Sequence, residues 1–114
     1  MERLIEIIIF QDRNGHEPFV EWIESIKNVN IVRRIYSRLD RLESGNLGDY
    51  KSVGEKVYEL RLFFGKGYRI YFGKIERKIV VLLCGGDKDT QARDIKKAQN
   101  YWKKFKEINN ENIS

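Results

Sequence analysis

The 114-residue chain is predicted to form a single α+β domain with the element order β-α-α-β-β-β-α. Three observations predict this fold class. A β-branched run at the start is followed by two stretches with apolar residues at helical spacing. Residues 57–72 alternate between two faces and contain a glycine turn, and a third apolar run then precedes a basic helix. This order favours one small, antiparallel-rich sheet with helices packed mainly on one face.

The first strand is predicted at Leu4–Phe10, LIEIIIF, because β-branched residues favour pleated, buried segments. The sequence DRNG at 12–15 has the residues of a turn. Pro18 follows, and proline suits the first turn of a helix because no hydrogen bond is lost there. The predicted helix has an apolar face at helical spacing, made of Phe19, Trp22, Ile23 and Ile26.

A second helix is predicted after a short link, with Asn28 or Asn30 as its N-cap and Gly45 at its end. Its apolar stripe consists of Ile31, Ile35, Leu39 and Leu42. Its polar side carries Arg33, Arg34, Arg38 and Arg41. Two interpretations remain open for these arginines. They contact nucleic acid, or they form a solvated helix face that pairs in part with Asp40 and Glu43.

The central element is a hairpin of two strands, 57–64 and 68–72, turned by Gly65 and Gly67 and preceded by a loop at 45–54. Alternate side chains of a strand point to opposite faces. One face of the hairpin is therefore apolar. The other carries Glu59, Arg61, Arg69 and Tyr71, and we expect this second face of the sheet to remain open.

A third central strand is predicted at 78–84, KIVVLLC, because it is apolar on both faces. A polar loop at 85–90, GGDKDT, follows, and Thr90 is a candidate N-cap for the last helix. That helix has a basic surface and an apolar stripe of Ile95, Ala98, Trp102 and Phe105. The domain is predicted to span 1–108, with a frayed C-terminal tail at 109–114.

The composition limits the classes of function. A net charge of +5 favours an acidic partner such as nucleic acid, although a small solvated protein also carries many charges. The lone cysteine, Cys84, excludes an internal disulfide and fits a cytoplasmic protein. The apolar runs are too short to span a bilayer, and the charged N-terminus does not resemble a signal peptide. One histidine, one cysteine and scattered acids predict neither a metal site nor a cofactor.

The polar hairpin face is the candidate site. Two guanidiniums, a phenol and a carboxylate on one surface suit a phosphodiester, because arginine offers a planar fork that matches phosphate. An ordinary structural interpretation is also open. Glu59 and Arg61 can form a simple ion pair, Arg69 and Tyr71 can be strand packing, and Lys88 can merely solvate its loop.

Across roughly residues 5–105, the chain resembles the RelE/ParE superfamily of toxins from toxin–antitoxin modules. The resemblance rests on three motifs in order: VYELR at 57–61, GYRIYF at 67–72 and LLCGGDKDTQ at 82–91. It is greatest toward the HigB-like, phage-derived branch of addiction module killer proteins. The resemblance implies a RelE-like fold and a cytoplasmic, ribosome-associated mRNA endoribonuclease. It also implies inhibition of translation, independence of metal, and neutralisation by a cognate antitoxin.

The resemblance also implies roles for individual residues. Arg61, Arg69 and Lys88 fall on positions that bind the scissile phosphate in RelE-like nucleases, and Lys51 lies near a further RNA-binding basic position. Tyr71 is a candidate to stack a base or donate a proton.

The sequence departs from the family at the proton-transfer positions. Relatives often carry a lysine at the position of Glu59, a basic residue at Asp89 and a histidine at Cys84. One hypothesis is that Glu59 acts as the general base beside the two arginines.

Two alternatives to the nuclease remain. ParE-like members of the superfamily are implied to inhibit DNA gyrase by binding alone, and a relative that has lost its toxicity would keep only the antitoxin contact. The resemblance implies an antitoxin, expected to be a helix-turn-helix DNA-binding protein, under all three interpretations. The mRNA on the ribosome is the further partner of the nuclease, and no membrane partner is expected.

Overall fold

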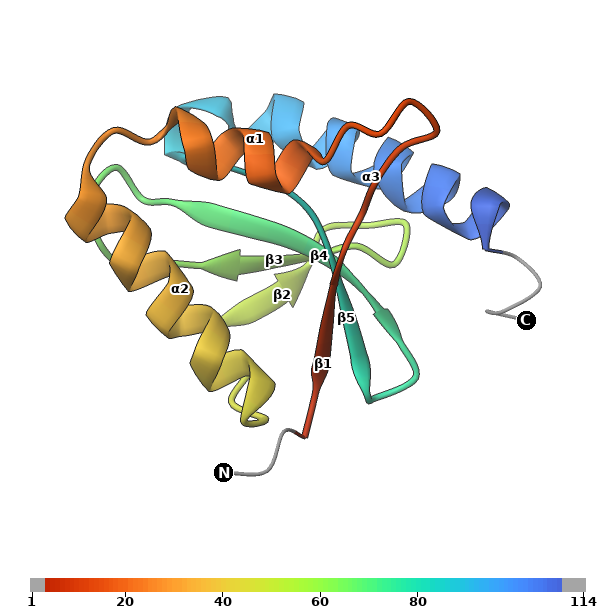
Figure 1. Ribbon diagram of the computed structural model, residues 1–114, viewed down its shortest axis with the longest axis horizontal. Helices are drawn as coiled ribbons and strands as arrows, with labels where there is room; N and C mark the ends of the chain where they lie inside the picture. The colour runs from red at the N-terminus through yellow and green to blue at the C-terminus, as the bar shows by residue number, and fades with distance from the viewer. Residues whose placement is uncertain (1–3, 110–114) are drawn as a thin grey trace.

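The protein, seen in a computed structural model that describes residues 4–109, is a compact α+β fold with one sheet and three α-helices (Figure 1). Its elements in chain order are β1 (Glu6–Ile9), α1 (Pro18–Ser25), α2 (Val29–Glu43), β2 (Tyr50–Ser52), β3 (Tyr58–Arg61), β4 (Arg69–Ile75), β5 (Ile79–Gly86), the 3₁₀ helix η1 (Lys88–Thr90) and α3 (Gln91–Ile108).

The sheet has five strands in the order β1-β5-β4-β3-β2. β1 runs parallel to β5, whereas every other neighbouring pair is antiparallel. The α+β class and the mainly antiparallel sheet are therefore confirmed. The loop predicted at 45–54 is wrong in part, because Tyr50–Ser52 forms an additional strand paired with β3. A tight turn with positive φ at Gly54, Glu55 and Lys56 brings this segment back alongside β3.

One face of the sheet is covered by α1 and α2, as predicted. The buried residues Ile35, Leu39 and Leu42 of α2 pack with Leu60 and Ile70 of the hairpin. The stripe read from the sequence is thus the buried side of this helix. Asn28 caps α2 as expected, since its side chain accepts hydrogen bonds from the backbone N–H groups of Asn30 and Ile31.

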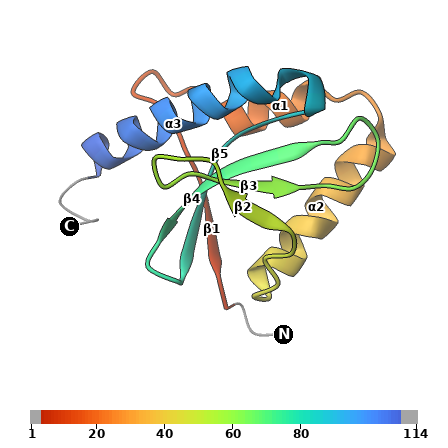
Figure 2. The same ribbon diagram turned by 180° about the vertical axis from the view of Figure 1, so that it is seen from behind.

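The opposite face is covered by α3, so the expectation of an open second face is wrong. Trp102 and Phe105 of α3 pack with Tyr71, Val81 and Leu83 of the sheet. Figure 2, seen from behind, shows α3 on the side opposite to α1 and α2. The predicted apolar stripe of α3 needed a partner surface, and this face of the sheet provides it.

The segment between β5 and α3 is more regular than the predicted loop. Gly85 and Gly86 continue β5, and 88–90 form one turn of 3₁₀ helix. Thr90 does not cap α3 with its side chain, because its hydroxyl donates a hydrogen bond to the Asp94 carboxylate. Asp87 instead accepts from the backbone N–H of Asp89.

Asn109 follows α3 as its C-cap, so the tail assigned to 109–114 falls mostly outside the described residues. Within residues 4–109, each helix is too short or too polar to cross a membrane.

Candidate functional site

The polar residues of the central hairpin meet as the sequence predicts. Glu59 lies opposite Tyr71, and Arg61 lies opposite Arg69, in the register of β3 and β4. Residues paired directly across two strands point to the same face. The two arginines and the carboxylate therefore form one cluster, which we call the arginine–glutamate cluster.

Glu59 is the centre of this cluster, and its side chain is fully buried. Its carboxylate lies between two guanidiniums, with Nε of Arg61 3.6 Å from Oε1 and Nε of Arg69 3.5 Å from Oε2. The Tyr71 hydroxyl and the Gln91 amide donate hydrogen bonds to Oε2, at 3.1 and 2.8 Å. A buried charge requires partners of this kind, because desolvation alone would be costly.

The two arginines differ in exposure. The Arg69 side chain is 13% exposed, and its Nη1 donates a hydrogen bond to the Gly67 carbonyl at 2.9 Å. The Arg61 side chain is 38% exposed. The cluster therefore holds one guanidinium firmly and presents the second to solvent.

Tyr71 is also fully buried, so the expectation that it lies on an open surface is wrong, as it is for Glu59. Helix α3 covers both residues. Burial raises the pKa of the Tyr71 phenol, and the nearby negative charge of Glu59 raises it further. A neutral, enclosed phenol is poorly placed to stack a base, and a carboxylate surrounded by its own donors is poorly placed to act as a general base.

Gln91 is a member of the cluster that the sequence did not reveal. It lies at the first residue of α3, and it reaches 32 positions back along the chain to Glu59. The only sequence signal was its place at the end of the LLCGGDKDTQ motif. The hydrogen bond from Gln91 to Glu59 connects the first residue of α3 to β3.

The two lysines predicted to bind RNA lie on either side of the cluster and are exposed. Lys88 is on η1, and its Cβ and the guanidinium of Arg69 both border Gly67. Lys51 is on β2, directly opposite Glu59 in the register. The structure thus brings Lys51, Arg61, Arg69 and Lys88 to one region of the sheet and its rim.

A large groove lies beside this cluster rather than over it. It has a volume of about 780 Å³, and residues of α1, the 65–68 turn, the end of β5 and α3 line it, among them Trp22, Tyr68 and Arg93. Neither Arg61 nor Arg69 lines it. In the described part of the chain, no group of three or more acidic, histidine or cysteine side chains gathers in a way that could hold a metal ion.

The chain is 46% identical over 81 residues to a protein of Haemophilus influenzae that is described as uncharacterized. The match covers 71% of this chain and 82% of the Haemophilus protein. The chain belongs to that protein's family. No model of a known protein family matches the chain. The geometry of the arginine–glutamate cluster is therefore the guide to what this family member does.

Proposed function

We propose that this protein is a RelE-like toxin of a type II toxin–antitoxin module, and that it cleaves mRNA without a metal ion. The observation that carries the proposal is the pairing of Arg61 with Arg69 across β3 and β4, with both guanidiniums held by the buried carboxylate of Glu59. The order of elements and the three sequence motifs support the RelE-like topology.

The reaction needs no cofactor. The ribose 2′-oxygen loses its proton and forms a bond to the adjacent phosphorus. The bond from phosphorus to the 5′-oxygen then breaks, and that oxygen leaves with a proton. Negative charge accumulates on the phosphate oxygens in the transition state. Fixed guanidiniums stabilise that charge without reorganising at the moment of reaction.

In this proposal Arg61, Arg69 and Lys88 contact the phosphate, and Lys51 guides the strand. Glu59, Tyr71 and Gln91 are positioning residues, because each is directed at the cluster rather than at solvent. The protons pass to and from water, since the described cluster offers no accessible acid or base. The protein then accelerates cleavage mainly by positioning the RNA and by stabilising the negative charge of the transition state.

The partners follow from the proposal. The mRNA is bound on the ribosome in the cytoplasm, and a cognate antitoxin with a helix-turn-helix DNA-binding domain silences the toxin. The net charge of +5 suits an acidic antitoxin segment.

A second candidate function is a ParE-like inhibitor of DNA gyrase, and a specific observation favours it. The groups expected to transfer protons, Glu59 and Tyr71, are buried beneath α3. A protein that acts by binding alone needs no such groups. A relative that keeps only its contact with the antitoxin also needs no group that transfers protons.

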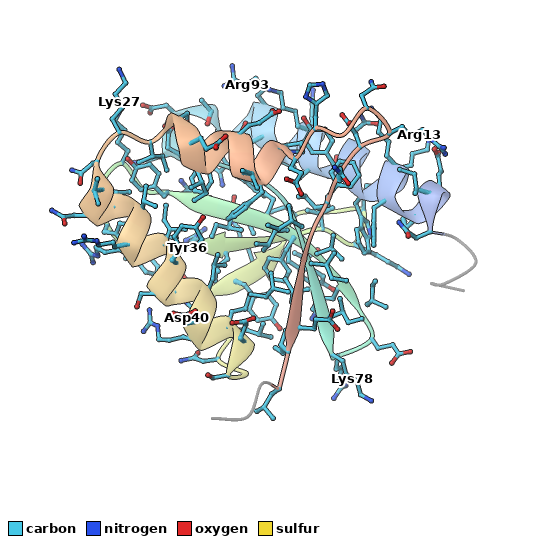
Figure 3. The ribbon with its side chains drawn as sticks, in the orientation of Figure 1. Arg13, Lys27, Tyr36, Asp40, Lys78 and Arg93 are labelled. Carbon is cyan, nitrogen blue, oxygen red and sulfur yellow. The ribbon has the colours of Figure 1, made fainter. Side chains whose placement is uncertain are left out.

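The test is translation in a cell-free bacterial extract, with the reporter mRNA mapped by primer extension and gyrase supercoiling assayed in parallel. The wild type is compared with Arg69→Ala and with Arg13→Ala, an exposed arginine in the loop after β1 (Figure 3). We expect new mRNA ends with the wild type and Arg13→Ala. The loss of a transition-state contact in Arg69→Ala should lower cleavage about 100-fold or more.

Two results would redirect the proposal. Intact mRNA together with lost supercoiling would establish the gyrase inhibitor. Intact mRNA with unchanged supercoiling would leave a protein that only binds its antitoxin.

A further inference from the structure

A second arginine-rich feature lies at the end of β3, away from the large groove. It is a pocket of about 260 Å³ between α2 and the end of β3. Four guanidinium-bearing residues and two aromatic residues contribute to it: Arg34, Arg38, Arg41, Arg61, Phe63 and Phe64. No acidic side chain lines it. We call it the arginine pocket.

The pocket follows from the spacing of arginines on α2. Residues 34, 38 and 41 are four and three positions apart, so they share one face of the helix. Arg33 of the same helix is exposed and does not line the pocket. The end of β3 contributes Arg61. Like charges are thus gathered in a pocket that no described acidic residue lines, although Arg61 is also paired with Glu59 in the arginine–glutamate cluster.

Arg38 is the most enclosed arginine of the pocket. The residue is only 7% exposed, and its Nη1 donates a hydrogen bond to the Asn46 carbonyl at 3.0 Å. Its Nη2 atom is buried and has no hydrogen-bond partner. Burial, together with the positive charge of Arg41, lowers the pKa of Arg38. This Nη2 atom packs against Gly48, where a Cβ would overlap it. Arg38 therefore adds positive charge beside the pocket, while the more exposed Arg34 and Arg41 are the groups that a bound anion would meet.

The aromatic residues indicate which anion fits. Phe63 is 75% exposed at the mouth of the pocket, whereas Phe64 is packed beneath the guanidinium of Arg34, 4.1 Å from its ring centroid. An exposed aromatic ring beside a cationic groove is the combination used to bind single-stranded nucleic acid. An acidic peptide would satisfy the arginines but would leave the Phe63 ring unused.

We propose that the arginine pocket binds a phosphate of a single-stranded polynucleotide, with the adjoining base stacked on Phe63. Arg61 lines the pocket and also belongs to the arginine–glutamate cluster. A strand with one phosphate at that cluster can therefore continue into the pocket. The inference rests on the proposed function only for the identity of the strand as RNA.

The experiment measures binding apart from cleavage. A short fluorescent RNA with 2′-O-methyl riboses cannot be cut by a 2′-oxygen, so its polarisation reports binding alone. The wild type is compared with Arg41→Ala and Phe63→Ala over a series of salt concentrations. Arg33→Ala is the matched control, since it removes the same charge from the same helix outside the pocket. Far-ultraviolet circular dichroism confirms that each variant is folded.

We expect Arg41→Ala to weaken binding roughly 10-fold and to reduce the salt slope by about 0.7, the value for one phosphate contact on a single strand. Phe63→Ala should weaken binding about 10-fold through lost stacking, with an unchanged salt slope. Arg33→Ala should bind as the wild type does.

Three results would overturn the inference. The first is a wild type that does not bind the oligonucleotide at low salt. The second is equal loss in Arg33→Ala and Arg41→Ala, which would indicate diffuse charge only. The third is displacement of the oligonucleotide by a polyglutamate peptide whose own binding depends on Arg41 but not on Phe63, which would make the pocket a protein interface. Because the probe cannot be cleaved, loss of binding and failure of the nuclease proposal give separate readouts.

Discussion

Replacing Glu59 with glutamine tests the central cluster most directly as a structural unit. The substitution keeps the size of the side chain and removes its charge. The carboxylate accepts hydrogen bonds from Tyr71 and Gln91 and lies within 3.6 Å of both guanidinium Nε atoms. A glutamine oxygen can still accept from Tyr71 or Gln91, but its NH₂ group would face positive charge.

The magnitude follows from the burial of the partners. Breaking a buried ion pair costs about 3–5 kcal/mol, because the remaining charge is left uncompensated. Arg69 is 13% exposed and carries most of that cost, whereas the more exposed Arg61 can rehydrate. Retention of one hydrogen bond offsets about 1 kcal/mol. We therefore expect the free energy of unfolding to fall by about 3 kcal/mol.

The assay is urea unfolding followed by tryptophan fluorescence and circular dichroism. With a slope of about 1–3 kcal/mol per molar urea, the midpoint should fall by roughly 1–3 M. Glu24→Gln on the exposed side of α1 is the control, and its free energy of unfolding should stay within about 0.5 kcal/mol of the wild type. A Glu59→Gln midpoint equal to that control would refute the buried charge network.

Three further predictions concern other parts of the fold. Asn28→Ala removes the cap of α2 and should lower the free energy of unfolding by about 1 kcal/mol in the same urea assay; no change would mean that the cap is dispensable. Gly73→Ala would place a Cβ 2.4 Å from the Trp102 ring, so we expect a loss of about 2 kcal/mol or more and altered tryptophan fluorescence, and a neutral effect would contradict the close packing of α3. Burial raises the pKa of the Cys84 thiol from 9.0 to about 12, so the unfolded chain loses this proton at lower pH than the folded protein does. Its contribution to stability is therefore full below pH 9 and is lost as pH rises toward 12. Urea titrations from pH 9 upward should show falling stability with a smaller slope in Cys84→Ala, and equal slopes would contradict the burial of the thiol.

Periodicity predicted the parts of the fold that depend on local pattern. The apolar stripe of α2, the alternation of the hairpin and its glycine turn all follow from spacing within one segment, and the structure confirms them. The prediction that Arg61 and Arg69 lie together on one face of the hairpin is confirmed for the same reason. Once the turn is fixed, the register decides which residues lie opposite one another.

Features that depend on tertiary contacts could not be predicted in this way. The strand at Tyr50–Ser52 is only three residues long and exists because β3 offers an edge. The covering of the second face by α3 depends on contacts such as Trp102 against Gly73, which are distant in sequence. The burial of Glu59 and the role of Gln91 depend on that same docking of α3, so single-segment patterns contained no signal for them.

The chemical nature of the RNA ends is the measurement that tests the proposed cleavage most directly. Attack by the 2′-oxygen releases a fragment with a free 5′-hydroxyl, which polynucleotide kinase labels without prior phosphatase treatment. The proposal predicts that fragments made by the wild type in the translation extract are labelled directly, and that Arg69→Ala yields few or none. Fragments that carry 5′-phosphates, or equal yields from both proteins, would contradict metal-independent cleavage by this arginine pair.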